Sequence, residues 1–160
     1  MHAAEPQKQH QWLNKLVGKW TFESECGMGE NQPPSKFKGS EVVTSIGGLW
    51  IVAQGEGEMP EGGVGRTLMA LGYDPQVERY VGSFVCSMMT HLWPYNGRLD
   101  ADEKVLTLDS EGPHCSQPGM AKYQDIITIV SDDHRILTSQ FQANDGTWQH
   151  FMTGHYRRRN

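Results

Sequence analysis

The chain has 160 residues and a formal net charge of -5 at pH 7. This length fits one domain over residues 1–160, because a single core typically serves a chain of up to a few hundred residues. The acidic balance disfavours nucleic acid and anionic membranes as partners. No apolar stretch approaches the roughly 20 residues that cross a bilayer. We therefore expect one soluble domain with neither a nucleic-acid nor a membrane partner.

The N-terminus and the cysteines bear on the cellular compartment. Residues 1–11 lack the apolar core of a signal peptide and carry Glu5, Lys8 and His10 instead. The three cysteines are an odd number and show none of the close pairing that thiolate metal sites or redox motifs use. We expect a cytoplasmic protein with reduced thiols.

One short helix is predicted near the start of the chain. Trp12, Leu13, Leu16 and Val17 fall at helical spacing on one face, which indicates an amphipathic helix over 10–17. From Trp20 onward, short apolar or alternating runs are separated by turn signals about every 8–12 residues, as in an all-β sandwich or barrel. The predicted strands are 18–26, 37–46, 49–58, 66–73, 78–87, 90–97, 104–111, 121–130, 135–142 and 147–157.

Most of the predicted connections are short enough for hairpins, which favours an up-and-down antiparallel β-barrel of about 8–10 strands over residues 18–158. Closing the sheet into a barrel removes exposed edges. A barrel of about 10 strands leaves room for an interior cavity unless large side chains fill it.

Several motifs resemble known barrel families. Gly18-Lys19-Trp20 after the helix resembles the opening of lipocalins, in which the indole plugs the closed end of the barrel. The stretches 72–75, 80–82, 87–97 and 151–158, with Thr90-His91-Leu92-Trp93-Pro94-Tyr95 at the centre, are similar to the bacterial family called domain of unknown function 1579. This resemblance implies a lipocalin-like (calycin-type) barrel, related in shape to the fatty-acid-binding proteins, and it implies no particular activity.

The densest group of candidate binding residues lies in this central block. His91, Trp93 and Tyr95 share one face of a strand, because successive side chains of a strand alternate. If that face lines the cavity, these side chains bind a small, largely apolar ligand. If it faces outward, they form a cross-strand aromatic ladder. The predicted ligand-binding residues are His91, Trp93, Tyr95, Ser87, Thr90 and Tyr123.

A second polar group spans two neighbouring strands. It comprises Asp109, Glu111, Lys122, Tyr123 and Asp125. Charges at this spacing are typical of a solvent face. If they point inward, we expect them to pair with each other or with a ligand, since an isolated buried charge is costly.

The last strand offers two interpretations. Tyr156 and Arg158 share a face and are similar to the Tyr and Arg that anchor a carboxylate in fatty-acid-binding proteins, although the order is reversed. Alternatively, Arg157 or Arg158 packs over Trp20 as a cation–π lid, as in lipocalins. His155 is also a candidate haem ligand, as in nitrobindin-like barrels, but the Gly-rich pattern of those proteins is missing after Trp20.

Enzyme motifs are absent from the sequence. It contains no Gly-x-Ser-x-Gly elbow, P-loop, dinucleotide fingerprint or His-Glu-x-x-His pair. A triad of Ser87, His91 and Asp109 can be drawn, but the sequence does not define its geometry. We assign no catalytic residue, metal or cofactor.

Three functions remain open. The first is binding of a small apolar molecule in the barrel. The second is an isomerase or hydrolase acting on such a molecule, which requires His91 beside a carboxylate with a shifted pKa. The third is a filled barrel that serves as the subunit of a homo-oligomer, which requires an outer apolar patch.

Overall fold

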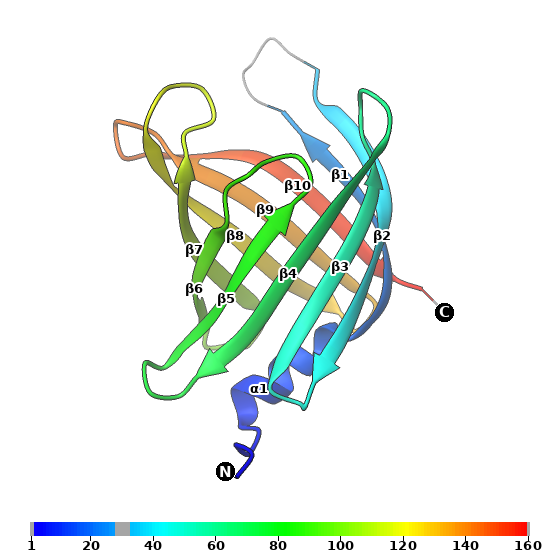
Figure 1. Ribbon diagram of the computed structural model, residues 1–160, viewed down its shortest axis with the longest axis vertical. Coiled ribbons are helices and arrows are strands. Elements are labelled where there is room, and N and C mark those ends of the chain that lie inside the picture. The colour runs from blue at the N-terminus through cyan, green and yellow to red at the C-terminus, as the bar shows by residue number, and fades with distance from the viewer. Residues whose placement is uncertain (1, 28–32, 160) are drawn as a thin grey trace.

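The computed structural model describes residues 2–27 and 33–159. Its strands form a closed antiparallel barrel with a short helix at one end (Figure 1). The strands are β1 (Gly18–Cys26), β2 (Ser35–Ile46), β3 (Trp50–Glu58), β4 (Val64–Asp74), β5 (Arg79–Cys86), β6 (Trp93–Leu99), β7 (Val105–Pro113), β8 (Met120–Ser131), β9 (His134–Gln142) and β10 (Trp148–Arg158). The predicted all-β barrel with one short N-terminal helix is confirmed.

The barrel is a simple meander. Each strand pairs with its neighbours in the chain, and β1 closes the circle by pairing with β10 from Trp20 opposite Arg158 to Cys26 opposite Met152. This closure leaves no unpaired edge strand in the described sheet. Alternation along each strand then sends every second side chain into the interior.

The helical segment differs slightly from the predicted range 10–17. Helix α1 (Lys8–Leu13) begins earlier, because the Gln7 and His10 side chains reciprocally cap its first turn, and it continues as the 3-10 turn η1 (Asn14–Leu16). Trp12, Leu13 and Leu16 are buried. The segment covers one end of the barrel, at the bottom of Figure 1, which we call the closed end; the opposite end is the open end.

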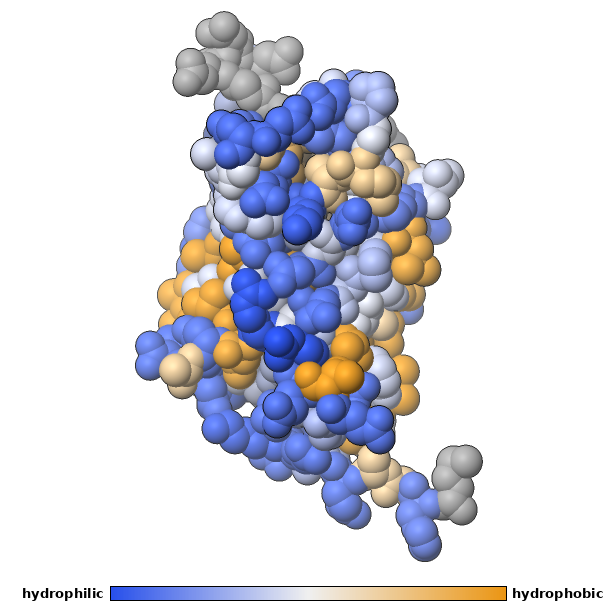
Figure 2. All heavy atoms as spheres, turned by 90° about the vertical axis from the view of Figure 1, so that its left-hand side faces the viewer, coloured by the Kyte–Doolittle hydropathy of each residue, from blue (hydrophilic) through white to orange (hydrophobic). Residues whose placement is uncertain are grey.

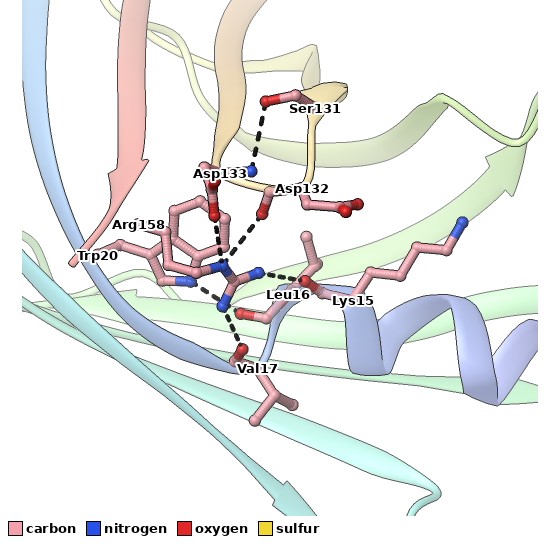
Figure 3. A network of polar contacts seen from close by, with 8 residues as sticks. All are labelled: Lys15, Leu16, Val17, Trp20, Ser131, Asp132, Asp133 and Arg158. Carbon is pink, nitrogen blue, oxygen red and sulfur yellow. Dashed lines mark hydrogen bonds and ion pairs between the residues drawn. The ribbon is translucent and has the colours of Figure 1, made fainter. Parts of the chain in front are cut away.

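Trp20 plugs the closed end as predicted. Its indole is 1% exposed, and its Nε1 donates a hydrogen bond to the Leu16 carbonyl at 2.9 Å. The guanidinium of Arg158 lies 4.3 Å from the indole and donates to the carbonyls of Val17 at 2.7 Å and Lys15 at 2.9 Å (Figure 3). Arg158 therefore ties the last strand to the end of the helical segment.

Glycine is required at position 18 for this arrangement. Gly18 has φ 140°, a conformation that other residues rarely adopt, and a Cβ there would lie 2.3 Å from Nη1 of Arg158. Of the two arginines expected over Trp20, Arg158 is thus the one that forms the lid, whereas the neighbouring Arg157 is exposed.

A buried ion pair lies above this plug. Arg135 on β9 pairs with Glu41 on β2, and their side chains are only 5% and 12% exposed. The Arg135 guanidinium also lies over the rings of Trp20, at 4.8 Å, and Tyr156, at 4.1 Å. The cavity beside the pair has a volume of only about 20 Å³, so the closed half of the interior is filled.

Candidate functional site

An aromatic wall lines the interior toward the open end. Trp93 on β6 meets Tyr123 on β8 edge to face at 4.8 Å, and Tyr123 lies 6.2 Å from Phe141 and 6.1 Å from Phe151. Edge-to-face aromatic contacts at such distances are stabilising. The wall is thus a packed apolar surface contributed by β6, β8, β9 and β10.

Backbone features direct Trp93 into this wall. A Cβ at Gly112 on β7 would lie 2.1 Å from the Trp93 indole, so the ring occupies space that only a glycine leaves. Pro94, the next residue, is exposed on the opposite face, and Tyr95 returns to the interior with 5% exposure. The outward aromatic ladder is therefore wrong, since Trp93 and Tyr95 both face inward.

His91 lies where this wall meets the open end. The residue is half-buried, its ring is 4.8 Å from that of Trp93, and its Nε2 lies 2.9 Å from the carbonyl oxygen of Glu111. It precedes β6, whereas the sequence predicted a strand over 90–97. Pro94 provides no N–H for the sheet, and pairing between β5 and β6 ends at Phe84 opposite Trp93.

A polar group lies at the foot of the wall. The two oxygens of the Asp125 carboxyl each accept one hydrogen bond, from the Tyr95 hydroxyl and from the Ser139 hydroxyl at 2.6 Å. These side chains come from β6, β8 and β9, and each faces the interior. We call Tyr95, Asp125 and Ser139 the interior carboxyl group.

Burial changes the acidity of this group. It raises the pKa of Asp125 above its usual range, and the hydrogen bonds from Ser139 and Tyr95 offset this only in part. Burial, followed by the charge of Asp125, raises the pKa of Tyr95 well above its usual value, so this phenol stays protonated and remains a donor. The Asp125 carboxyl is surrounded by protein, and the residue as a whole is half-buried.

Replacing Asp125 with Asn should change how stability depends on pH. Because the folded-state pKa of Asp125 is raised, its stabilising contribution is fully present below the unfolded-state pKa, about 3.9, and is lost as the pH rises through the folded-state value. Asn does not titrate. The unfolding free energy of the variant relative to wild type should therefore increase between pH 4 and pH 8, measured by urea unfolding.

The matched control is Asp109→Asn on the neighbouring strand. Asp109 faces outward, where it pairs with Arg98 and accepts a hydrogen bond from Gln124 at 2.9 Å. Removing this exposed charge should add little pH dependence. A difference between Asp125→Asn and wild type that stays constant across the same pH range would contradict the raised pKa.

The wall opposite the aromatic one carries small side chains. The inward positions of β3, β4 and β5 toward the open end include Gly55, Thr67 and Cys86, which follow each other across the sheet in register. Phe84, on the same side, is half-buried. This wall therefore carries small side chains, whereas the opposite wall carries large aromatic rings.

The predicted site residues separate in the structure. Trp93, Tyr95 and Tyr123 come together in the interior, with His91 at its mouth. Ser87 and Thr90 are exposed in the loop between β5 and β6. The Ser87 hydroxyl accepts a hydrogen bond from the Arg66 backbone at 2.9 Å, so neither residue joins the interior group.

The alternative catalytic and haem arrangements do not form. Ser87 bonds to Arg66, and His91 bonds to a backbone carbonyl rather than to a carboxylate, so the Ser87-His91-Asp109 triad is wrong. His155 is exposed on the outer face, where its Nδ1 lies 3.0 Å from Nε2 of His134, and it does not point toward an interior haem. Over residues 2–27 and 33–159, no three His, Cys, Asp or Glu side chains converge as a metal site.

The second predicted polar group divides between the two faces of the sheet. Tyr123 and Asp125 point inward, whereas Lys122 and Glu111 are exposed and Asp109 pairs with Arg98 on the outside. The face of the barrel in Figure 2 is mostly hydrophilic, with smaller apolar groups at both edges and below its centre. The expected solvent face is therefore correct for Asp109, Glu111 and Lys122, and the inward alternative is correct for Tyr123 and Asp125.

Outward apolar side chains gather on another part of the barrel. Val42, Leu68 and Val85 on β2, β4 and β5 are 38%, 36% and 39% exposed and lie in one register row with Gln54. They line an open surface concavity of about 480 Å³ together with polar residues such as Ser40 and Arg66. This is the outer apolar feature that the homo-oligomer hypothesis requires, and oligomerisation stays a prediction.

Four interior polar residues could not be found from the sequence, and three of them have polar partners inside the barrel. They are Ser139, which bonds to Asp125 on the neighbouring strand β8, and Arg135 and Glu41, which pair between the separated strands β9 and β2. A signal existed for Asp125, which occupies an inward position in the alternating series Tyr123, Asp125, Ile127 and Ile129. Ser110, inward and opposite Tyr123, is the fourth; its hydroxyl is buried without a hydrogen-bond partner among the described residues.

The fold and its interior site define a lipocalin-like, calycin-type β-barrel with a polar group inside the open half. The chain belongs to the family described as protein of unknown function (DUF1579), whose model matches residues 5–158. This confirms the resemblance that its motifs indicated. A search of curated proteins found no match. No helix within the described residues is long and apolar enough to cross a membrane.

Solved structures with the same fold have little sequence in common with this chain. Rv2717c from M. tuberculosis is 12% identical, with a TM-score of 0.62 over 98% of this chain and 100% of its own. The S-type phycobiliprotein lyase CPES from Guillardia theta is 14% identical, with a TM-score of 0.59 over 97% of this chain and 99% of its own. The barrel EF1p2_mFAP2b, solved bound to DFHBI, is 12% identical, with a TM-score of 0.51 over 95% and 100%.

Proposed function

We propose that this protein binds a small, largely apolar molecule in the open half of the barrel interior. The observation that carries the proposal is the interior carboxyl group: an acidic side chain, held by two hydroxyls inside the barrel, at the foot of an aromatic wall. Ligand pockets combine apolar walls with a few fixed polar groups in this way. A buried carboxyl is costly to stability, so its presence favours a functional role.

Two further features support binding at this place. The aromatic wall of Trp93, Tyr123, Phe141 and Phe151 provides an apolar surface, and the small residues of β3, β4 and β5 lie across the barrel from it. A protein of the same fold has been solved bound to the small molecule DFHBI. In this arrangement His91 lies at the mouth, and Tyr95 and Ser110 add hydroxyls near the foot of the pocket.

Binding of Nile red, a neutral apolar dye, tests the proposal. Wild type should bind about one equivalent with an increase in dye fluorescence, and Trp93→Ala should weaken the affinity about tenfold, or about 1.4 kcal/mol. The loss follows from removing one face of the aromatic wall. His91→Ala should also weaken binding, because the ring lies 4.8 Å from Trp93 at the mouth.

The matched control is Trp148→Ala, since Trp148 is 38% exposed at the start of β10. This variant should bind the dye like wild type. Thermal unfolding of each variant separates lost binding from lost folding. Unchanged affinity in both His91→Ala and Trp93→Ala would contradict the proposed pocket, and native mass spectrometry would show any molecule that co-purifies.

A further inference from the structure

The charged side chains inside the barrel are unequally matched. Among the described residues, the inward strand positions carry four charged groups: Glu41, Asp125, Arg135 and, at the closed end, Arg158. Arg135 is paired with Glu41. Arg158 is held by the carbonyls of Val17 and Lys15. Asp125 therefore has no cationic partner in the described structure.

The partners of Asp125 are neutral hydroxyls. The Ser139 hydroxyl donates to one carboxyl oxygen at 2.6 Å, and the Tyr95 hydroxyl donates to the other. Both hydroxyls donate, so each carboxyl oxygen is an acceptor, and a nearby cation would favour the ionised form. A carboxylate has about four acceptor positions, so about two remain open when each oxygen accepts one bond. The hydroxyls orient the carboxylate without balancing its charge.

Both interior arginines already have partners for their charge, although the Nε donor of Arg135 is buried without a hydrogen-bond partner among the described residues. The Arg135 guanidinium is stacked on Tyr156 at 4.1 Å as well as paired with Glu41, and Arg158 is stacked on Trp20 at the closed end. The Tyr and Arg that share a face of the last strand therefore do not form a carboxylate anchor. A carboxylate ligand would instead meet the like charge of Asp125 in surroundings that screen it poorly.

We infer that the pocket selects its ligand by the head group: it takes a molecule with an apolar body and a protonated primary amine, and it disfavours the corresponding carboxylate. This inference rests on the proposed function. An ammonium group supplies the positive charge that Asp125 lacks. It also supplies N–H donors for the open acceptor positions of the carboxylate. An alcohol supplies a donor without the charge and should rank between the two.

Displacement of Nile red by three amphiphiles with the same alkyl chain tests the inference. At neutral pH, dodecylammonium should displace the dye from wild type at a concentration about tenfold lower than 1-dodecanol requires. Dodecanoate should require the highest concentration. The two ionic amphiphiles are used below their micelle-forming concentrations and the alcohol below its solubility limit, and circular dichroism confirms that each protein variant is folded.

Asp125→Asn should abolish the preference, because it keeps the size of the side chain and removes the charge. The amine should lose its advantage, and dodecanoate should gain affinity. Asp109→Asn, which removes an outward charge from β7, should keep the wild-type order. This pair of variants distinguishes the local carboxylate from the net charge of the protein.

The outcomes separate the two proposals. If wild type binds Nile red but dodecanoate displaces it as well as the amine does, the head-group inference is overturned and the pocket stands. The same holds if the amine preference survives in Asp125→Asn. If wild type binds neither the dye nor, by calorimetry, dodecylammonium, both the pocket and its selectivity are overturned.

Discussion

Replacing Trp20 with alanine should lower the free energy of unfolding by about 3–5 kcal/mol, the usual range for deleting a large aromatic side chain from a core. The indole is 1% exposed, and it bonds the Leu16 carbonyl at 2.9 Å. It also underlies the guanidinium groups of Arg135 and Arg158. Its removal leaves a cavity at the closed end, and both guanidinium groups lose the ring on which they pack.

The measurement is urea unfolding followed by far-ultraviolet circular dichroism, which avoids the loss of a fluorescent tryptophan. Trp148→Ala is the control, because Trp148 is 38% exposed and bonds to no part of the plug. It should cost much less than Trp20→Ala. A loss below about 1 kcal/mol for Trp20→Ala would contradict its role as a plug, since that is the average effect of any substitution.

The strand order and the plug could be predicted because they depend on local patterns. The predicted strand 18–26 coincides with β1, and the other strands begin and end within a few residues of the prediction. Turn residues mark strand ends through their own backbone preferences. The Gly18-Lys19-Trp20 motif predicted that Trp20 plugs the closed end. In the structure Arg158, and not Arg157, packs over the indole.

The interior polar residues could not be predicted in the same way, because their partners lie far apart in the chain. Tyr95 and Asp125 are separated by 30 residues, and Arg135 and Glu41 by 94. Alternation says which residues share a face, but not which face is inside. Asp125 was therefore grouped with its outward neighbour Lys122, although it belongs to the inward series of β8.

The loop before β6 could not be predicted for a different reason. Ser87, Thr90 and His91 were expected on strands, where alternation would have fixed their directions. The chain leaves the sheet after Cys86 and returns at Trp93, so the period of two does not apply between them. Only His91 remains near the aromatic wall, through its contact with Trp93.

Replacing Arg135 with methionine should also be costly, by about 3–5 kcal/mol, because the change leaves Glu41 buried without its countercharge. The side chain of Glu41 is 12% exposed, so water does little to replace the lost partner. Methionine keeps most of the apolar stem over Trp20 and Tyr156, which isolates the loss of charge. The free energy of unfolding in urea measures the cost.

The double variant, Glu41→Leu with Arg135→Met, distinguishes the ion pair from simple packing. Replacing both members of a buried pair with apolar residues is often neutral or stabilising, so the double variant should recover most of what Arg135→Met loses. Arg66→Met in the exposed pair with Glu56, whose side chains are 73% and 59% exposed, should cost no more than about 1 kcal/mol. If the effects of Glu41→Leu and Arg135→Met simply add, the two charges do not depend on each other. Arg135 would then be able to pair with an anionic ligand in place of Glu41. That result would weaken the argument that the interior prefers an amine.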